Sequence, residues 1–343
     1  MPSLADYSLE ELSALFKRWG HLPVHAKRLL RAYYDHAGRP ALDQVAIAHR
    51  LRERVAAEIP LLNTQVVSRA ASADGTVKLL LACVDGERVE SVLMPDYRPE
   101  RSAGCLSTQA GCPMACDFCA TGTQGFTRNL TAGEIIEQFL ALKTESAAVC
   151  RILRTVVLMG MGEPLLNLAN VVKAIHLLAG DHTAHLGWRQ ITLSTVGLLP
   201  QLQEFVDLKL NVQLALSLHA PDDQLRARLV PAAKRSAIAD LLSLAQQHQQ
   251  NTGRITIIQY CLLAGVNDSP EQALALARLL AGRRMHVNLL THNPVGRPYQ
   301  SSSPAAIDAF LGMLRNNGIV AHLRRSRGQD IAAACGQLRT IAT

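Results

Sequence analysis

The stretch Arg154-Thr-Val-Val-Leu-Met-Gly160 is a short apolar run that ends on glycine, and a helical pattern begins soon after it at Asn167. Further runs repeat this arrangement, with helical patterns that begin near Ser236, Ser269 and Ser303 between them: QITLSTV (190–196), NVQLALSLH (211–219), RITIIQYCLL (254–263), MHVNLLTH (285–292) and GIVAHLRR (318–325). Repeated strand–helix units predict an α/β fold with a parallel sheet and right-handed crossovers, either an open sheet or a full or partial barrel. In such folds the chemistry collects at the carboxyl ends of the strands.

Two different patterns precede these units. The first sixty residues contain short amphipathic helical patterns, the first of which opens with a capping box of Ser8 and Glu11. From Thr64 to Pro95 apolar residues alternate with period two in three runs separated by Asp-Gly pairs, which predicts three antiparallel strands. We therefore expect four segments: a small, basic N-terminal helical accessory domain (1–62), a short antiparallel β extension (63–98), the strand–helix core (99–325) and a C-terminal tail (326–343).

The composition restricts the class of protein. A length of 343 residues suggests roughly two domains, and 48% hydrophobic with 18% charged residues excludes a disordered chain. No apolar run is long enough to cross a membrane, and the N-terminus lacks the basic-then-apolar order of a signal peptide. We therefore expect a soluble, cytoplasmic protein with no membrane association.

The excess positive charge is concentrated near the N-terminus. Nine basic and three acidic residues lie between Lys17 and Arg54, so this segment carries a net charge of +6 out of +7 for the whole chain. Such a segment suits a polyanionic partner, and a solvated helix face accounts for it about as well.

Four of the eight cysteines lie within fifteen positions, which favours metal or redox chemistry over a disulfide framework in a chain without a secretion signal. Cys112, Cys116 and Cys119 have the spacing C-x3-C-x2-C. Three thiolates on one loop would leave one iron of a four-iron cluster open to a substrate, and this is the spacing of the radical S-adenosylmethionine (SAM) enzymes. A zinc site closed by Cys105 or a histidine is the alternative, because structural zinc normally takes four ligands.

Glycine and polar residues follow several predicted strands at the edge where a ligand would bind. Gly162 lets the backbone approach a ligand closely, and the carboxylate of Glu163 suits an ammonium group such as that of SAM. Four further polar residues lie at equivalent strand ends, where each could instead cap the next helix: Ser194, Ser217, His219 and Asn293. Near the C-terminus, Cys335 and Gly336 lie in a tail of small residues, a pattern that suits a mobile functional loop.

Together these motifs resemble the RlmN/Cfr family of radical SAM adenine C-methyltransferases, which act on 23S ribosomal RNA. The resemblance runs from about Arg88 to Leu338 and is carried by CLSTQAGCPMACDFCATGTQGFTRNLT (105–131), GMGEPLLN (160–167), LSTVG (193–197), LSLHAP (216–221), GVNDS (265–269), NLLTHNP (288–294) and DIAAACGQL (330–338). The cysteine seven residues before the cluster motif and the cysteine of the C-terminal ACGQ are specific to this family. The resemblance implies a partial (βα) radical SAM barrel. It also implies one [4Fe-4S] cluster on Cys112, Cys116 and Cys119, with SAM at the open iron.

The resemblance also implies a mechanism, because carbon 2 or carbon 8 of adenine has no nucleophilic electron pair and needs a radical route. In the family, the cysteine that matches Cys335 first takes a methyl group from one SAM by displacement. A second SAM, reduced at the cluster, yields a 5′-deoxyadenosyl radical that removes hydrogen from this methyl group, and the resulting thiomethylene radical adds to the base. The cysteine that matches Cys105 then resolves the enzyme–RNA adduct by forming a disulfide with Cys335.

Further residues gain roles from the resemblance. Glu90 aligns with the family carboxylate proposed as the base for the ring proton, although from the sequence alone an exposed strand carboxylate is the favoured interpretation. The SAM-contacting positions of the family match Gly162, Glu163, Ser194, Ser217, Leu218, His219 and Asn293. Cys83, Cys150 and Cys261 match no functional position, and we expect them to be buried as small hydrophobic residues.

The implied partners are RNA, with 23S ribosomal RNA as the first candidate and transfer RNA as a further one, and an electron donor such as flavodoxin. We expect a monomer. Carbon 2 is slightly favoured over carbon 8, because the match QGF-x-RNL (124–130) to the carbon-2 branch is longer than the match ATG (120–122) to the carbon-8 branch. Two other function classes remain: a radical SAM enzyme acting on a protein or small molecule, which needs neither Cys105 nor Cys335, and a non-enzymatic zinc-bearing RNA-binding module.

Overall fold

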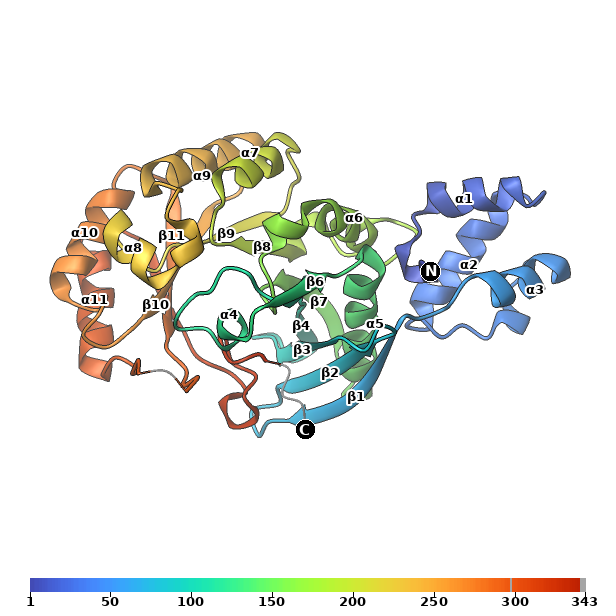
Figure 1. Cartoon of the computed structure of the whole chain (residues 1–343), viewed down its shortest axis with the longest axis horizontal. Helices are drawn as coiled ribbons and strands as arrows, with labels where there is room; N and C mark the ends of the chain where they lie inside the picture. The colour runs from blue at the N-terminus through green and yellow to red at the C-terminus, as the bar shows by residue number, and fades with distance from the viewer. Residues whose placement is uncertain (297, 340–343) are drawn as a thin grey trace.

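The computed structural model describes residues 1–296 and 298–339 and is dominated by one ten-stranded sheet (Figure 1). The strands lie in the order β1-β2-β3-β4-β7-β8-β9-β10-β11-β12, and from β4 onward each is parallel to the next. β1, β2 and β3 are antiparallel, as the period-two pattern predicts. Among the described residues β1 and β12 form the two edges of the sheet, so the expected α/β fold is confirmed as an open, partial barrel.

The strands of this sheet are β1 (Thr64–Ala71), β2 (Val77–Cys83), β3 (Arg88–Pro95), β4 (Arg101–Cys105), β7 (Ile152–Leu158), β8 (Ile191–Thr195), β9 (Gln213–Ser217), β10 (Thr256–Leu262), β11 (Met285–Thr291) and β12 (Ala321–Arg324). A separate two-stranded sheet contains β5 (Gln109–Gly111) and β6 (Phe126–Asn129). The helices are α1 (Leu9–Arg18), α2 (Val24–Asp35), α3 (His49–Glu58), α4 (Ala120–Gln124), α5 (Ala132–Ala148), α6 (Leu168–Ala179), α7 (Leu199–Asp207), α8 (Asp223–Leu229), α9 (Ile238–Thr252), α10 (Pro270–Leu280) and α11 (Pro304–Asn316).

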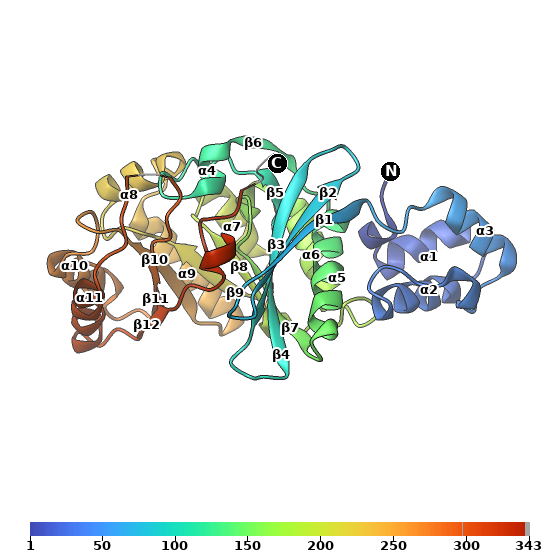
Figure 2. The same ribbon diagram turned by 90° about the horizontal axis from the view of Figure 1, so that it is seen from below.

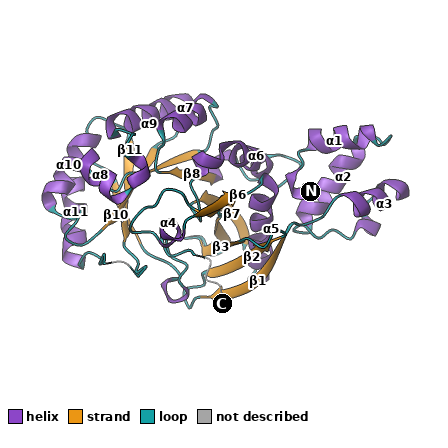
Figure 3. Cartoon of the chain, in the orientation of Figure 1, coloured by secondary structure: helices purple, strands orange, loops and turns teal. Residues whose placement is uncertain are grey.

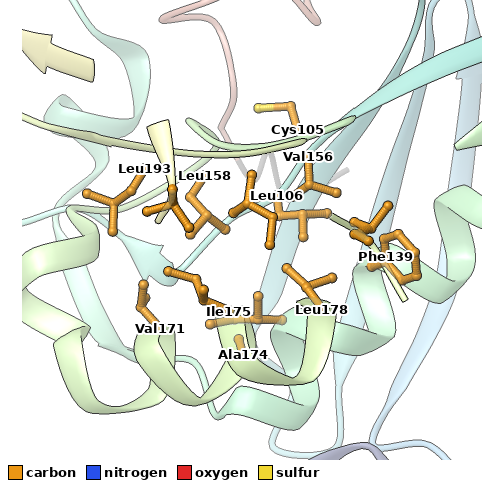
Figure 4. Packing of buried hydrophobic residues seen from close by; sticks show 14 of the residues in the cluster. Cys105, Leu106, Phe139, Val156, Leu158, Val171, Ala174, Ile175, Leu178 and Leu193 are labelled. Atoms are coloured by element: carbon orange, nitrogen blue, oxygen red, sulfur yellow. The ribbon is translucent and has the colours of Figure 1, made fainter. Parts of the chain in front are cut away.

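The long helices of the core lie on the outer side of the curved sheet, as Figure 3 shows in purple and orange. Ile175 and Leu178 of α6 pack against Val156 and Leu158 of β7, and all four side chains are at most 1% exposed (Figure 4). Burying an aliphatic side chain of this size contributes about 2 kcal/mol. Cys105 lies on the other side of the sheet from these helix-facing side chains in Figure 4, so the inner face of the sheet is available for a site.

Helices α1, α2 and α3 form a module at one end of the molecule, beside α5 and α6 (Figure 2). The segment that precedes α1 docks on the first turns of α5. The carboxylate of Asp6 accepts a hydrogen bond from the backbone N–H of Gly133 at 2.7 Å, and Ser3 donates to Glu137 at 2.6 Å. Because the first N–H groups of a helix have no partner within the helix and carry partial positive charge, a buried carboxylate at this position is stabilising.

Replacing Asp6 by alanine should lower the free energy of unfolding by about 2 kcal/mol, since a charge-assisted hydrogen bond is lost and a buried N–H group is left unpaired. Urea unfolding followed by circular dichroism measures the change. Asp43→Ala is the matched control, because Asp43 is exposed in the same N-terminal module. Equal stabilities for the two variants would contradict this account of the docking.

The predicted helix starts at Asn167, Ser269 and Ser303 are confirmed, because each residue is the N-cap of a helix. The start near Ser236 is slightly wrong, since α9 begins at Ile238 with Ala237 as its N-cap. Ser236 is occupied elsewhere: its hydroxyl accepts from the N–H of Leu199, and its carbonyl accepts from Arg226. No helix among the described residues has the length and apolar character needed to cross a bilayer.

Candidate active site

The residues singled out in the sequence gather at the carboxyl edge of the parallel strands. Cys105 is the last residue of β4, Ser217 is the last residue of β9, and Ser194 is the penultimate residue of β8. The hydroxyl oxygens of Ser194 and Ser217 are 3.3 Å apart. Asn293 follows β11 by two residues. None of Ser194, Ser217, His219 and Asn293 caps the next α-helix, since the N-caps of α7, α8 and α11 are Leu198, Asp222 and Ser303, so the capping alternative is wrong for these four.

The loop that carries the three clustered cysteines is fixed by backbone contacts. The N–H of Cys112 donates to the carbonyl of Gly125 at 2.7 Å, and the N–H of Cys119 donates to that of Cys116 at 3.2 Å. Gly111, directly before the motif, has φ +75°, and a Cβ atom there would lie 2.0 Å from the carbonyl oxygen of Gly125. Only glycine therefore fits at this position.

Burial opposes the ionisation of two of these thiols, Cys112 and Cys116. Burial raises the pKa of Cys112 to about 12 and raises the pKa of Cys116 well above its usual range, with the neighbouring thiols adding to both shifts. The loop would therefore hold thiolates only with compensating positive charge, such as that of bound iron. The described residues contain no group of three or more His, Cys, Asp or Glu side chains placed to hold one metal ion. Cysteine thiolates are the ligands of iron–sulfur clusters, so the three cysteines of this loop supply the donor type that such a cluster would need.

Glu163 lies beside this loop as a buried carboxylate, 2% exposed, without an ion-pair partner among the described residues. Its oxygens accept from the backbone N–H groups of Leu165 at 3.0 Å and Val196 at 2.9 Å. Burial raises its pKa, against the lowering effect of hydrogen bonds from Thr195 and Val196. An ammonium group in the site would supply the positive partner that this carboxylate lacks.

The other predicted SAM positions line the same edge. Gly162 has φ +106°, and a Cβ atom there would come within 2.6 Å of the Gln109 side chain. His219 also has a positive φ of 61°, and its Nδ1 accepts from the N–H of Cys261 at 3.0 Å. Burial lowers the pKa of His219 to about 3, so this side chain is neutral and acts as a fixed acceptor. Leu218 is fully buried beside it.

The C-terminal tail returns to this edge and brings Cys335 to it. The backbone carbonyl of Cys335 accepts from the Asn293 side chain at 3.0 Å, and the carbonyl of Gly336 accepts from the N–H of Ala120 at 2.7 Å. Although Cys335 is exposed, desolvation by the surrounding chain raises the pKa of its thiol. A thiolate at Cys335 would raise the pKa of Cys105, after the larger effect of burial, so the two thiols lie within electrostatic reach of each other. Both are free thiols here, and the disulfide between them stays a prediction.

Glu90 differs from the favoured interpretation of the sequence, because it is 5% exposed and therefore buried. Its carboxylate forms an ion pair with Lys78 at 2.8 Å and accepts from the N–H of Arg339 at 2.9 Å. The strand alternation expected from the sequence is correct, but the tail covers this face of β3. Val92 pairs with Cys105 across the antiparallel β3–β4 register, and Glu90 is two residues before Val92, so Glu90 and Cys105 face the same side.

The remaining cysteines divide into two groups. Cys83 and Cys261 are buried, as expected. Cys150 is exposed and lies in the turn after α5 with φ +56°, so the expectation that it packs as a small hydrophobic residue is wrong. An apolar neighbourhood in the sequence did not reveal that the helix ends at Ala148.

The chain is similar in sequence to known proteins. Residues 106–319 match the model of the radical SAM superfamily. The chain is 52% identical to a probable dual-specificity RNA methyltransferase RlmN 1 from Opitutus terrae, over 98% of this chain and 97% of that protein. The chain belongs to the RlmN family of radical SAM RNA methyltransferases. A probable RlmN of Thermus thermophilus is 44% identical over 89% of this chain and 86% of its own.

The fold agrees with this membership. The crystal structure of a radical SAM methyltransferase from Sphaerobacter thermophilus superposes with a TM-score of 0.94 at 39% identity, covering 99% of each chain. Membership in the RlmN family implies an iron–sulfur cluster and SAM, and it makes the chain an enzyme. The non-enzymatic zinc module is therefore set aside. Cys112, Cys116 and Cys119 are the residues that would hold the cluster, and their donor chemistry fits it.

Sequence reasoning missed Lys78, which links the carboxylate of Glu90 to the backbone carbonyl of Ala332 at 3.1 Å in the tail. A weak signal was present in the alternation, because Lys78 lies opposite Val92 and therefore on the same face as Glu90. The sequence could not show that this face is covered by a segment more than 250 residues away.

Replacing Gly111 by alanine should prevent the loop from holding iron, because the new methyl group collides with the backbone carbonyl of Gly125. The matched control is Gly253→Ala, where φ is +71° but no atom lies within 4 Å of the added carbon. Both variants should lose about 1 kcal/mol of stability from backbone strain. Only Gly111→Ala should also lose iron and sulfide after anaerobic reconstitution. Full iron content in Gly111→Ala would contradict the assigned loop.

Proposed function

We propose that the enzyme methylates a ring carbon of an adenosine in 23S ribosomal RNA, with transfer RNA as a further substrate and carbon 2 slightly favoured over carbon 8. The observation that carries this proposal is the return of the tail, which brings the Cys335 thiol to the strand edge that holds Cys105 and the cysteine loop. A methyl-carrying thiol and a resolving thiol must both reach the base, and the placement of Cys335 and Cys105 at one strand edge supports these roles. The relatives' name, dual-specificity RNA methyltransferase, supports more than one RNA substrate.

The proposed division of labour follows from these contacts. Cys335 carries the methyl group, Cys105 resolves the covalent adduct by forming a disulfide with it, and Glu90 accepts the ring proton. Cys112, Cys116 and Cys119 would hold the cluster, which would supply the chemistry of reductive SAM cleavage with an electron from a donor such as flavodoxin. Glu163 receives the ammonium group of SAM, while Gly162, Ser194, Ser217, Leu218, His219 and Asn293 line its binding site.

A cavity of about 270 Å³ between the antiparallel extension and the tail offers a place for the base. It is lined by Ser68, Ala70, Lys78, Leu80, Glu90, Ile331, Ala332, Gln337 and Arg339. Its lining combines apolar side chains with a carboxylate, an ammonium and a guanidinium group, a mixture that suits a single nucleobase extruded from folded RNA.

The N-terminal module supports an RNA substrate. Eight of its nine basic residues between Lys17 and Arg54 are exposed, Arg52 being the half-buried one. Arginine and lysine side chains presented in this way bind phosphate groups and do not select sequence. We infer that the module binds the RNA backbone while a monomeric core acts on one base.

Mass spectrometry of nucleosides from 23S ribosomal and transfer RNA tests the proposal, in a host without its own adenine C-methylation. Expression of the enzyme should produce 2-methyladenosine, or 8-methyladenosine if the less favoured carbon is the target. Cys335→Ala should abolish the product, and Cys150→Ala, at an exposed cysteine away from the site, should not. Unmodified RNA with cluster-loaded protein, or methylation that persists in Cys335→Ala, would favour a radical SAM enzyme with another substrate or mechanism.

The ion pair of Glu90 predicts a pH dependence. Burial raises the pKa of Glu90, and Lys78 and the N–H of Arg339 oppose this rise. In Lys78→Met the opposing charge is absent, so the pKa of Glu90 should rise further. If the carboxylate form is the base, the acidic limb of the kcat/KM profile should move to higher pH.

Lys78→Arg should restore the wild-type limb, because it retains the charge. Arg69→Met is the control, since Arg69 lies on the same extension and pairs instead with Glu145 at 2.8 Å. An acidic limb that is the same in Lys78→Met and wild type would exclude Glu90 as the titrating base.

A further inference from the structure

Arg226 is a buried cation that the proposed chemistry does not use. It lies on α8 and is 1% exposed. One guanidinium nitrogen donates to the carbonyl of Val196 and another to that of Ser236 at 3.2 Å, while Nε has no hydrogen-bond partner. Among residues 1–296 and 298–339, no carboxylate oxygen lies within 4.0 Å of the guanidinium.

The positive charge of this buried guanidinium is not fully compensated by the groups around it. Transfer of an unpaired charge from water into a protein interior costs several kcal/mol, and two neutral carbonyl acceptors recover only part of it. The nearest acidic side chain on the same helix is Asp223, but its carboxylate is exposed and accepts from the N–H of Ile238 at 2.8 Å. The chain itself therefore supplies no full anionic partner for Arg226.

The place where an anion would lie is indicated by the packing of α8. The carbonyl of Leu229, one turn after Arg226, accepts from the N–H of Asp117 at 3.2 Å, which ties the helix to the cysteine loop. Leu225 and Leu229 pack in the same apolar cluster as Cys112 and Cys116. Burial lowers the pKa of Arg226, and the charges of Asp223 and then Cys116 oppose this effect.

Arg226 and Glu163 hold the same residue from two sides. The N–H of Val196 donates to Glu163 and its carbonyl accepts from Arg226. The two charged groups thus contact opposite sides of one peptide segment, and Arg226 lies on the helix whose Leu229 carbonyl contacts the residue after Cys116. The two charges do not meet each other, which leaves each of them for a different ligand.

We propose that Arg226 is the counter-charge of the iron–sulfur cluster and favours its reduced state. This rests on the proposed ligand set Cys112, Cys116 and Cys119. Three thiolates outnumber the two positive charges of the oxidised core, and one-electron reduction makes the assembly more negative still. A buried cation beside one ligand therefore stabilises the reduced form more than the oxidised form. Arg226 is in this sense a positioning and electrostatic residue and not a catalytic one.

The test is the midpoint potential of the reconstituted cluster in the absence of SAM and RNA, measured by redox titration with electron paramagnetic resonance. Arg226→Gln should shift the potential to more negative values and speed the loss of iron to a chelator. Arg226→Lys keeps the charge but alters the hydrogen-bond geometry, so it should retain a potential close to that of the wild type. Arg228→Gln, two residues away and exposed on the same helix, should match the wild type.

The outcomes separate this inference from the proposed function. A wild-type protein that binds no iron would overturn the ligand set and with it this inference. A loaded Arg226→Gln protein with the wild-type potential would overturn the inference alone. If Arg226→Gln does not load, the potential of Arg226→Lys decides. A wild-type value supports the charge role, and a value displaced to lower potential assigns Arg226 to bracing the loop through its carbonyl hydrogen bonds.

Discussion

The parallel direction of the strands is the constraint on which the site depends. From β4 to β12 each strand runs the same way as its neighbour, so their carboxyl ends share one edge of the sheet. Cys105, Glu163, Ser194, Ser217 and Asn293 lie between 23 and 76 residues from the next of them in the chain, yet this single geometric rule collects them. The outer helices bury the outer face of the sheet, so the residues at its inner edge are not needed for packing against helices.

The antiparallel extension provides the surface on which the C-terminal tail docks. Asp74 accepts from the N–H of Gly328 at 3.0 Å, and hydrogen bonds from Thr76 and Gly328 lower its pKa to about 2 despite the opposing effect of burial. Lys78 donates to the carbonyl of Ala332, and Glu90 accepts from the N–H of Arg339. The tail is thus anchored on both sides of Cys335, and the thiol is held at the site by backbone contacts that tolerate a change in its side chain.

The periodic features of the fold could be predicted from the sequence, because hydrophobic alternation and strand–helix repetition are local signals. Strands β1 to β3 and β7 to β12 and the helix caps at Asn167, Ser269 and Ser303 follow from them, whereas the sequence pattern does not indicate β4, β5 and β6. The environment of Glu90 could not be predicted, since its burial depends on a tail that is distant in sequence. Nor could the exposure of Cys150, which depends on where α5 ends, or the isolation of Arg226, which depends on which elements α8 contacts.

Buried charge is the feature that distinguishes a site built for ligands from an ordinary core. Glu90 forms an ion pair with Lys78 at 2.8 Å. Glu163 and Arg226 have opposite charges and share Val196 as a hydrogen-bond partner, yet they form no ion pair with each other among the described residues. A buried charge without an ion-pair partner costs several kcal/mol unless hydrogen bonds compensate for it, as they do for the buried Glu137. In the proposed function, the carboxylate would complete its charge balance with the ammonium group of SAM, and the guanidinium with the thiolate-bound cluster.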